Sequence, residues 1–232
     1  MTMLTLSDIN THYGQAHILR DVSLHVGAGE VVALLGRNGA GKSTTMKAVI
    51  GMVAASSGSI HYRDQDLRKL KNYQRARLGI GFVPEGRRIF KKLTVLENLT
   101  SGRKPARQGQ EPWTIERAFA LFPKLVELQD RWGGQLSGGE QQMLTVARTL
   151  MTNPDCLLLD EPTEGLAPVV VEAVTAGIKH LKDQGIAILL SEQNRHTAAA
   201  LADRIYVLEK GQIIYAGALG AMSAQAHNTL GW

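Results

Sequence analysis

One glycine-rich segment constrains the fold of this chain more than any other feature. It reads Gly36-Arg37-Asn38-Gly39-Ala40-Gly41-Lys42-Ser43, follows the apolar run Val31 to Leu35, and precedes a helix-like stretch that ends at Gly51. Glycines let backbone N–H groups close around phosphate oxygens, and the start of a helix adds the positive end of its dipole. The order of strand, loop and helix therefore predicts a phosphate-binding loop. A glycine-rich turn capped by Ser43 is the purely structural alternative.

Each residue type in the segment suits a particular contact with a bound nucleotide. Lys42 would reach the β- and γ-phosphates, the hydroxyl of Ser43 would bind Mg²⁺, and Thr44 would touch the α-phosphate. The loop itself would supply the remaining contacts, from Gly36, Arg37, Asn38, Gly39, Ala40 and Gly41.

The other apolar runs predict an α/β fold with a mostly parallel sheet. Two alternating runs near the start, Leu4 to Ile9 and Ile18 to Val26, suggest a small antiparallel sheet. Strands alternate with helical stretches further on, which favours parallel pairing with helices on both faces. The buried strands are expected at Gly79 to Val83, Cys156 to Leu159, Ile186 to Leu190 and Ile205 to Leu208.

Between Gly86 and Pro154 the apolar residues have helical spacing. We therefore expect a helical subdomain at about residues 86–155, inserted in a single domain that spans 1–232.

A second candidate for the site is an apolar strand that ends in two carboxylates, Asp160 and Glu161. In enzymes with this type of phosphate loop, such an Asp holds Mg²⁺ and the neighbouring carboxylate orients the attacking water. We assign these roles to Asp160 and Glu161, respectively. A surface acidic turn before Pro162 is the alternative interpretation.

The segment Leu136-Ser137-Gly138-Gly139-Glu140 has two interpretations. Ser137 followed by Glu140 is a capping box at the start of a helix. A cap alone does not require two glycines, and Gly138 and Gly139 leave N–H groups uncovered at a helix N-terminus. The segment therefore also predicts a second phosphate-binding device in the same chain.

Together, the loop, the Ser137–Gly139 segment and the acidic strand resemble the ATP-binding cassette (ABC) ATPases, in the order typical of that family. The resemblance implies a P-loop NTPase (RecA-like) core with a mostly parallel sheet, an N-terminal antiparallel β subdomain and an inserted helical subdomain. It also implies ATP and Mg²⁺ as ligands. It further implies a head-to-tail dimer, in which Ser137, Gly138 and Gly139 of one subunit complete the γ-phosphate site of the other.

Four further positions follow from the resemblance. Tyr13 matches the aromatic residue that stacks on adenine, and an ordinary strand aromatic is the less favoured alternative. Glu85 replaces the usual glutamine that contacts the metal, and Gln193 replaces the usual γ-phosphate histidine. We expect Gln193 to act as a sensor without proton transfer, because an amide donates a hydrogen bond but does not become cationic. Ala167 replaces the usual aspartate of a loop that crosses the dimer.

These departures resemble one group in particular: the smaller ATP-binding subunit of branched-chain amino-acid uptake systems, and the related amide and urea importers. The segments that carry this likeness are Pro84 to Phe90, Leu136 to Leu144, Glu164 to Pro168 and Ser191 to Asn194. The likeness implies two membrane-spanning permease subunits, a second ATP-binding subunit and, indirectly, a periplasmic solute-binding protein. It places the chain peripherally at the cytoplasmic face of the inner membrane. Neither the solute nor the choice between homodimer and heterodimer follows from it.

Composition narrows the alternatives. Lys and Arg exceed Asp and Glu by 26 to 21, which favours anionic partners and leaves open a soluble ABC ATPase that acts on nucleic acid or ribosomes. Aromatic residues are only 5%, which disfavours base stacking, so no nucleic acid is expected. The basic residues of 68–77 and 87–92 are expected to form solvated faces or to face anionic lipid. The single cysteine argues against a secreted protein held by disulfides. The lack of a long apolar run argues against a membrane-spanning chain.

Overall fold

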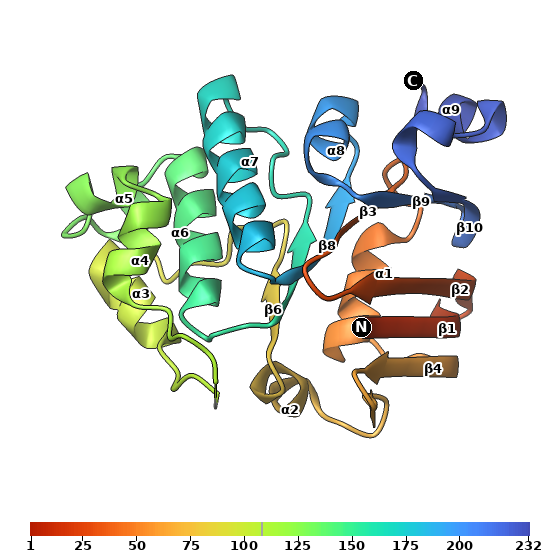
Figure 1. Ribbon diagram of the computed structural model, residues 1–232, viewed down its shortest axis with the longest axis horizontal. Helices are drawn as coiled ribbons and strands as arrows, with labels where there is room; N and C mark the ends of the chain where they lie inside the picture. The colour runs from red at the N-terminus through yellow and green to blue at the C-terminus, as the bar shows by residue number, and fades with distance from the viewer. Residues whose placement is uncertain (108) are drawn as a thin grey trace.

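The computed structural model describes residues 1–107 and 109–232, and they form two β-sheets with helices packed on them (Figure 1). The larger sheet has the strand order β10-β9-β3-β8-β7-β6, and all neighbours are parallel except the edge strand β10. Its strands are β3 (Val31–Leu35), β6 (Ile80–Val83), β7 (Cys156–Asp160), β8 (Ala187–Glu192), β9 (Arg204–Glu209) and β10 (Gln212–Gly217). This arrangement confirms the predicted α/β fold.

The smaller sheet is antiparallel, with the order β2-β1-β4-β5. It contains β1 (Thr2–Tyr13), β2 (Ala16–Gly27), β4 (Ser57–Tyr62) and the short β5 (Gln65–Asp66). The two strands predicted near the start are confirmed, and each is longer than expected. The apolar pattern does not predict β4, β5 or β10, because few or no side chains in these strands are fully buried.

The central strands are apolar throughout because both faces of the larger sheet are covered. All side chains of β3, β7 and β8 are buried. Along β3, Val32 and Leu34 point into a core shared with the smaller sheet, whereas Ala33 and Leu35 belong to a separate cluster on the other face. This period of two is what a strand requires when its two faces meet different layers.

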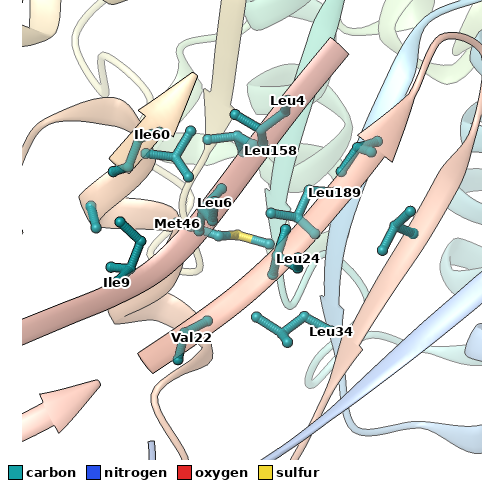
Figure 2. Packing of buried hydrophobic residues seen from close by; sticks show 14 of the residues in the cluster. Leu4, Leu6, Ile9, Val22, Leu24, Leu34, Met46, Ile60, Leu158 and Leu189 are labelled. Atoms are coloured by element: carbon teal, nitrogen blue, oxygen red, sulfur yellow. The ribbon is translucent and has the colours of Figure 1, made fainter. Parts of the chain in front are cut away.

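The helix after the glycine-rich loop, α1 (Lys42–Ile50), lies between the two sheets (Figure 2). Met46 of α1 is fully buried between Leu6 and Leu24 of the smaller sheet and Leu189 of the larger one. Burial of one such side chain is worth roughly 1.5–3 kcal/mol. The packing therefore fixes the direction of α1, and with it the position of the loop at its start.

Helices α3 (Val95–Gly102), α4 (Ile115–Leu121), α5 (Lys124–Glu127) and α6 (Gly138–Leu150) follow one another at the end of the molecule opposite the smaller sheet (Figure 1). The expected helical content of this stretch is thus present. The remaining helices are α2 (Asn72–Arg77), α7 (Pro168–Asp183), α8 (Arg195–Leu201) and α9 (Ala224–Leu230). Across residues 1–107 and 109–232, no helix is both long enough and apolar enough to span a bilayer.

Arg75 corrects the expectation that the basic residues of 68–77 are all solvated. Its side chain is buried, and Nη1 donates hydrogen bonds to the carbonyls of Ala48 and Val49 at 2.7 and 2.8 Å, while Nε donates to Leu70 O. The guanidinium therefore satisfies the carbonyl of Val49 at the end of α1 and gives the carbonyl of Ala48 a second donor beside Gly51 N. Gly51 makes room for it, because a Cβ there would lie 2.8 Å from the Arg75 guanidinium. The φ of Gly51, +78°, also favours glycine at this position.

We predict that Arg75→Met lowers the free energy of unfolding by about 1–3 kcal/mol, because Val49 O and Leu70 O lose the donors that Arg75 supplies and Ala48 O keeps only Gly51 N. Denaturant unfolding measures the change. The matched control is Arg77→Met, an exposed arginine of the same helix, for which we expect a change within about 0.5 kcal/mol. Equal effects of the two substitutions would contradict the capping role.

Candidate active site

The glycine-rich loop folds around the ammonium group of Lys42. Lys42 Nζ donates to Gly36 O at 2.7 Å and to Arg37 O at 3.3 Å, so the loop holds its own lysine. Gly36 permits close packing on β9, since a Cβ there would lie 2.5 Å from Leu208 O. Gly39 has a φ of +80° and an open space where its Cβ would be. The loop therefore presents bare backbone, which is the surface a phosphate group requires.

Asp160 lies beside Ser43, as the sequence predicts. The Ser43 hydroxyl donates to Asp160 Oδ1 at 3.0 Å, although the two residues are far apart in the sequence. Ser191 of β8 donates to the same oxygen at 2.7 Å, because Asp160 and Ser191 are paired in the parallel register of β7 and β8. A hydroxyl and a carboxylate so close together form the all-oxygen ligand set that Mg²⁺ prefers, and these residues thus fit that ion.

Glu161 forms a buried ion pair with Lys42. Glu161 Oε1 lies 3.0 Å from Lys42 Nζ, and the two side chains are only 7% and 3% exposed, respectively. Gln193 Nε2 donates to Glu161 Oε2 at 2.7 Å and to Asn38 Oδ1 at 2.8 Å, so the amide links this carboxylate to the glycine-rich loop. The predicted residues Lys42, Glu161 and Gln193 are therefore in direct contact.

The backbone of Glu161 is held in an unusual conformation. Its φ of +48° lies in the left-handed region, which costs a non-glycine residue roughly 1–3 kcal/mol. Two bonds stabilise this geometry: Glu161 N donates to Ser191 O at 3.2 Å and to Ser191 Oγ at 3.0 Å. The conformation turns the side chain back towards Lys42.

Two neighbouring carboxyl groups have shifted pKa values. Burial opposes ionisation of Glu161, but hydrogen bonds from Glu164, Lys42 and Gln193, together with the charge of Lys42, outweigh it and lower the pKa of this carboxyl. The hydrogen bond with Glu161 raises the pKa of Glu164 to about 7, and burial and the charges of Glu161 and Glu85 act in the same direction. Of the two carboxyl groups, Glu164 is therefore the one that keeps a proton to higher pH.

A cavity of about 440 Å³ adjoins these groups and is large enough for a small-molecule ligand. It brings together most of the residues predicted to contact a nucleotide. Its lining consists of Tyr13, Ile18, Asn38, Gly39, Gly41, Lys42, Ser43, Thr44, Glu85, Glu161 and Glu164. A larger cavity of about 540 Å³ lies elsewhere, near Arg63 and Asp155, but these two side chains already pair with each other at 2.6 Å.

The Ser137–Gly139 segment does not line the 440 Å³ cavity of its own chain. Ser137 caps α6 by accepting from Glu140 N at 3.3 Å, and Glu140 Oε2 accepts from Ser137 N at 2.7 Å. The predicted capping box is thus confirmed. Gly139 packs against α7, since a Cβ would lie 2.7 Å from a methyl group of Val170.

Sequence reasoning missed three polar residues of the site. Ser191 orients both Asp160 and Glu161, and only the strand register reveals it. Buried Glu192 accepts from Thr163 Oγ1 at 2.6 Å and from the backbone N–H of Gln193 at 3.1 Å, so it braces the turn after Glu161. Burial raises the pKa of Glu192. Glu164 lies three residues after Glu161, and this spacing is the one feature of the sequence that could have indicated its place in the site.

We predict that Glu164→Gln changes how stability depends on pH. Between pH 4.5 and about 7 the folded chain keeps a proton on Glu164 that the unfolded chain releases, so wild-type stability falls as the pH rises through this window. Gln mimics the protonated group. The variant should match the wild type below the window and be more stable above it.

Unfolding free energies measured across this pH range test the prediction. Glu172→Gln, which removes an exposed carboxyl from α7, controls for the loss of a charge. A difference between Glu164→Gln and wild type that is constant with pH would rule out the shared proton.

Comparison with known proteins agrees with the geometry. The family model described as "ABC transporter" matches residues 19–164. BraG, a high-affinity branched-chain amino acid transport ATP-binding protein of Pseudomonas aeruginosa, is 44% identical over 91% of both chains. LptB, a lipopolysaccharide export system ATP-binding protein of Escherichia coli, is 36% identical over 94% of this chain and 91% of its own.

The fold also matches a solved structure, the dimeric post-hydrolysis state of the ATP-binding cassette MJ0796 bound to ADP and Pi. The TM-score is 0.81, with 25% identity over 94% of this chain and 99% of the other. The family model covers more than half of the chain, and both relatives exceed 30% identity over nearly its full length. The chain therefore belongs to the ABC transporter family, and it is an ATP-binding cassette that hydrolyses ATP.

Proposed function

We propose that this ATPase energises the uptake of a branched-chain amino acid or a related small polar solute through partner membrane subunits. The observation that carries the catalytic part is the convergence of Lys42, Glu161 and the Ser43–Asp160 pair at one cavity. These groups come from the ends of β3 and β7, on either side of β8 in the sheet.

Binding of ATP is assigned to the glycine-rich loop and its neighbours. Lys42 and the N–H groups of residues 36–44 neutralise phosphate charge, and the half-exposed ring of Tyr13 offers a stacking surface for adenine. Ser43 and Asp160 would hold Mg²⁺, with Glu85 as a further oxygen ligand. When bound, Mg²⁺ supplies positive charge against the phosphate oxygens.

Hydrolysis is assigned to Glu161, with Gln193 beside it. A carboxylate with a lowered pKa is ionised at neutral pH and accepts a hydrogen bond from water. Glu161 is paired with Lys42, so a phosphate group that binds Lys42 would compete with Glu161 for the ammonium group. Gln193 donates to Glu161 and Asn38, which suits a residue that senses both the loop and the carboxylate.

A dimer is proposed to complete the site. Ser137, Gly138 and Gly139 lie outside the cavity of their own chain, and the N-terminus of α6 favours an anion. A head-to-tail arrangement would place this N-terminus against the ATP of the other subunit. The other subunit is proposed to be a second, different ATP-binding chain, with a homodimer forming in its absence.

The remaining assembly is proposed to contain two permease subunits and, indirectly, a periplasmic solute-binding protein, at the cytoplasmic face of the inner membrane. The inserted helical subdomain, residues 86–155, would face the permeases. A groove of about 330 Å³ between this segment and the core supports the assignment. It is lined by Phe82 and by Phe90, whose ring is 54% exposed beside the guanidinium of Arg148.

Uptake is favoured over export by the degree of similarity. Identity to BraG is 44%, whereas identity to LptB is 36% over a similar share of the chain. The segments 84–90 and 191–194 support the same assignment.

We predict that Glu161→Gln retains ATP binding and loses hydrolysis by roughly 100-fold or more, because the amide does not accept a proton from water. ATP affinity should rise, since Lys42 is released from its ion pair. Phosphate release and titration with a fluorescent ATP analogue measure the two quantities. Lys42→Ala is the companion variant, and it should lose binding itself. Hydrolysis at the wild-type rate by Glu161→Gln would remove Glu161 from the mechanism.

We further predict that cells lacking this chain lose uptake of radiolabelled leucine, isoleucine or valine. The wild-type gene should restore uptake, and the gene carrying Glu161→Gln should not, because it binds ATP without turnover. Normal uptake of all three, combined with a defect in lipopolysaccharide export, would contradict the proposed solute and leave the ATPase assignment intact.

A further inference from the structure

Arg87 occupies a strained position between the two motifs that a head-to-tail dimer would use for different ATP molecules. It lies in the loop after β6, two residues beyond Glu85, which lines the nucleotide cavity. Its φ is +43°, in the left-handed region, and its carbonyl accepts a hydrogen bond from Ile89 N at 2.8 Å. Strain of this kind persists only where the surrounding contacts hold the residue in place.

The guanidinium of Arg87 contacts two other loops of the same chain. Nη2 donates to Glu164 O at 3.1 Å. Nη1 lies against the backbone of Gly138, where an added Cβ would overlap it. The glycine at position 138 therefore leaves the space that the guanidinium fills. Arg87 also corrects the expectation that the basic residues of 87–92 are simply solvated.

The loop that carries Arg87 is anchored on its other side by α3 and α6. The buried side chain of Asn98 accepts from Phe90 N at 2.9 Å and donates to Phe90 O at 3.0 Å. Arg148 of α6 donates to Arg88 O and stacks on the Phe90 ring. A displacement of the α6 N-terminus is thus transmitted to a loop that is already fixed to the same helix.

The two contacts of Arg87 are with segments that, in the proposed dimer, belong to two different ATP sites. Glu164 closes the turn that starts at Glu161, with Glu164 N donating to Glu161 O at 3.3 Å. Gly138 belongs to the Ser137–Gly139 segment at the start of α6. Within one chain, the first serves its own ATP and the second serves the ATP of the partner. This reasoning rests on the proposed dimer.

We propose that Arg87 is a positioning residue that couples the two ATP sites of the dimer, by joining the Glu161 turn to the Gly138 end of α6 in one rigid unit. A planar guanidinium does this because it donates along one edge and packs with the other. Lysine keeps the charge but has a single ammonium group, which does not reproduce the two-sided contact. Occupation of one site then favours the geometry that the other requires.

The test compares Arg87→Lys and Arg87→Ala with wild type in ATP hydrolysis as a function of ATP concentration, using the dimer or the pair with its second ATP-binding subunit. Wild type should be cooperative, and both variants should have a Hill coefficient of about 1. Affinity of the isolated chain for a fluorescent ATP analogue should be unchanged. The matched control is Arg88→Ala, the exposed neighbour whose side chain forms no hydrogen bond or ion pair within residues 1–107 and 109–232.

A double-mutant cycle with Gly138→Ala tests the contact itself, with ATP affinity of the assembled dimer measured alongside because Gly138 also belongs to the proposed composite site. The added methyl group displaces the guanidinium, so the loss of cooperativity from Gly138→Ala and Arg87→Ala together should be less than additive. Full cooperativity in Arg87→Lys would overturn the proposal, because charge alone would then suffice. Loss of ATP affinity in the isolated Arg87 variants would also overturn it.

The proposed ATPase mechanism and the coupling fail in different ways. Wild type without hydrolysis in either assembly would contradict the mechanism itself. Wild type that hydrolyses ATP with no cooperativity would leave the mechanism standing and refute the coupling.

Discussion

The buried ion pair between Lys42 and Glu161 is the interaction on which the site depends. Two charged groups that are almost wholly buried are stable only when paired and hydrogen-bonded, and here the two come from loops more than a hundred residues apart in the sequence. The parallel sheet makes the pairing possible, because β3 and β7 flank β8 and all three end at the same edge. Polar groups at the carboxyl ends of neighbouring parallel strands meet there.

The same pair determines what an anionic ligand must displace. Each charge satisfies the other, so an anionic ligand must replace Glu161 as the partner of Lys42. Apart from the ion pair, Glu161 is bonded to Gln193 and held in its left-handed turn by Ser191, and neither of these contacts depends on the charge of Lys42. Catalytic geometry is thereby kept through hydrogen bonds to neutral groups, while charge is redistributed.

The sequence predicts the centre of this protein much better than its edges. The strands β3, β7 and β8 are buried on both faces and are therefore continuous apolar runs, which were located to within a residue or two. The glycine-rich loop needs glycines for its backbone conformation, so the sequence predicts it equally well. In contrast, β10 is an edge strand with no fully buried residue, and its pattern is too weak to detect.

Side-chain contacts that depend on the register between strands also cannot be predicted from the sequence. Ser191 acts through its alignment with Asp160, a long-range pairing that no local pattern encodes. Arg75 and Arg87 are expected at the surface because charged residues are mostly exposed, yet both fill space beside a glycine, Gly51 and Gly138, respectively. A glycine that leaves room for a distant guanidinium looks, in the sequence, the same as one required by a turn.

The departures from the family pattern at positions 85 and 167 both change the hydrogen bonds that the site can form. Ala167 offers no polar group where α7 begins, and Glu85 lacks the donor of an amide, so two routes for hydrogen bonding between the halves of the site are missing. Arg87, by contrast, bonds to Glu164 and packs on Gly138. With Ala167 and Glu85 at these positions, the guanidinium of Arg87 remains as a polar link between the Glu161 turn and the start of α6, which is why the proposed coupling is assigned to this residue.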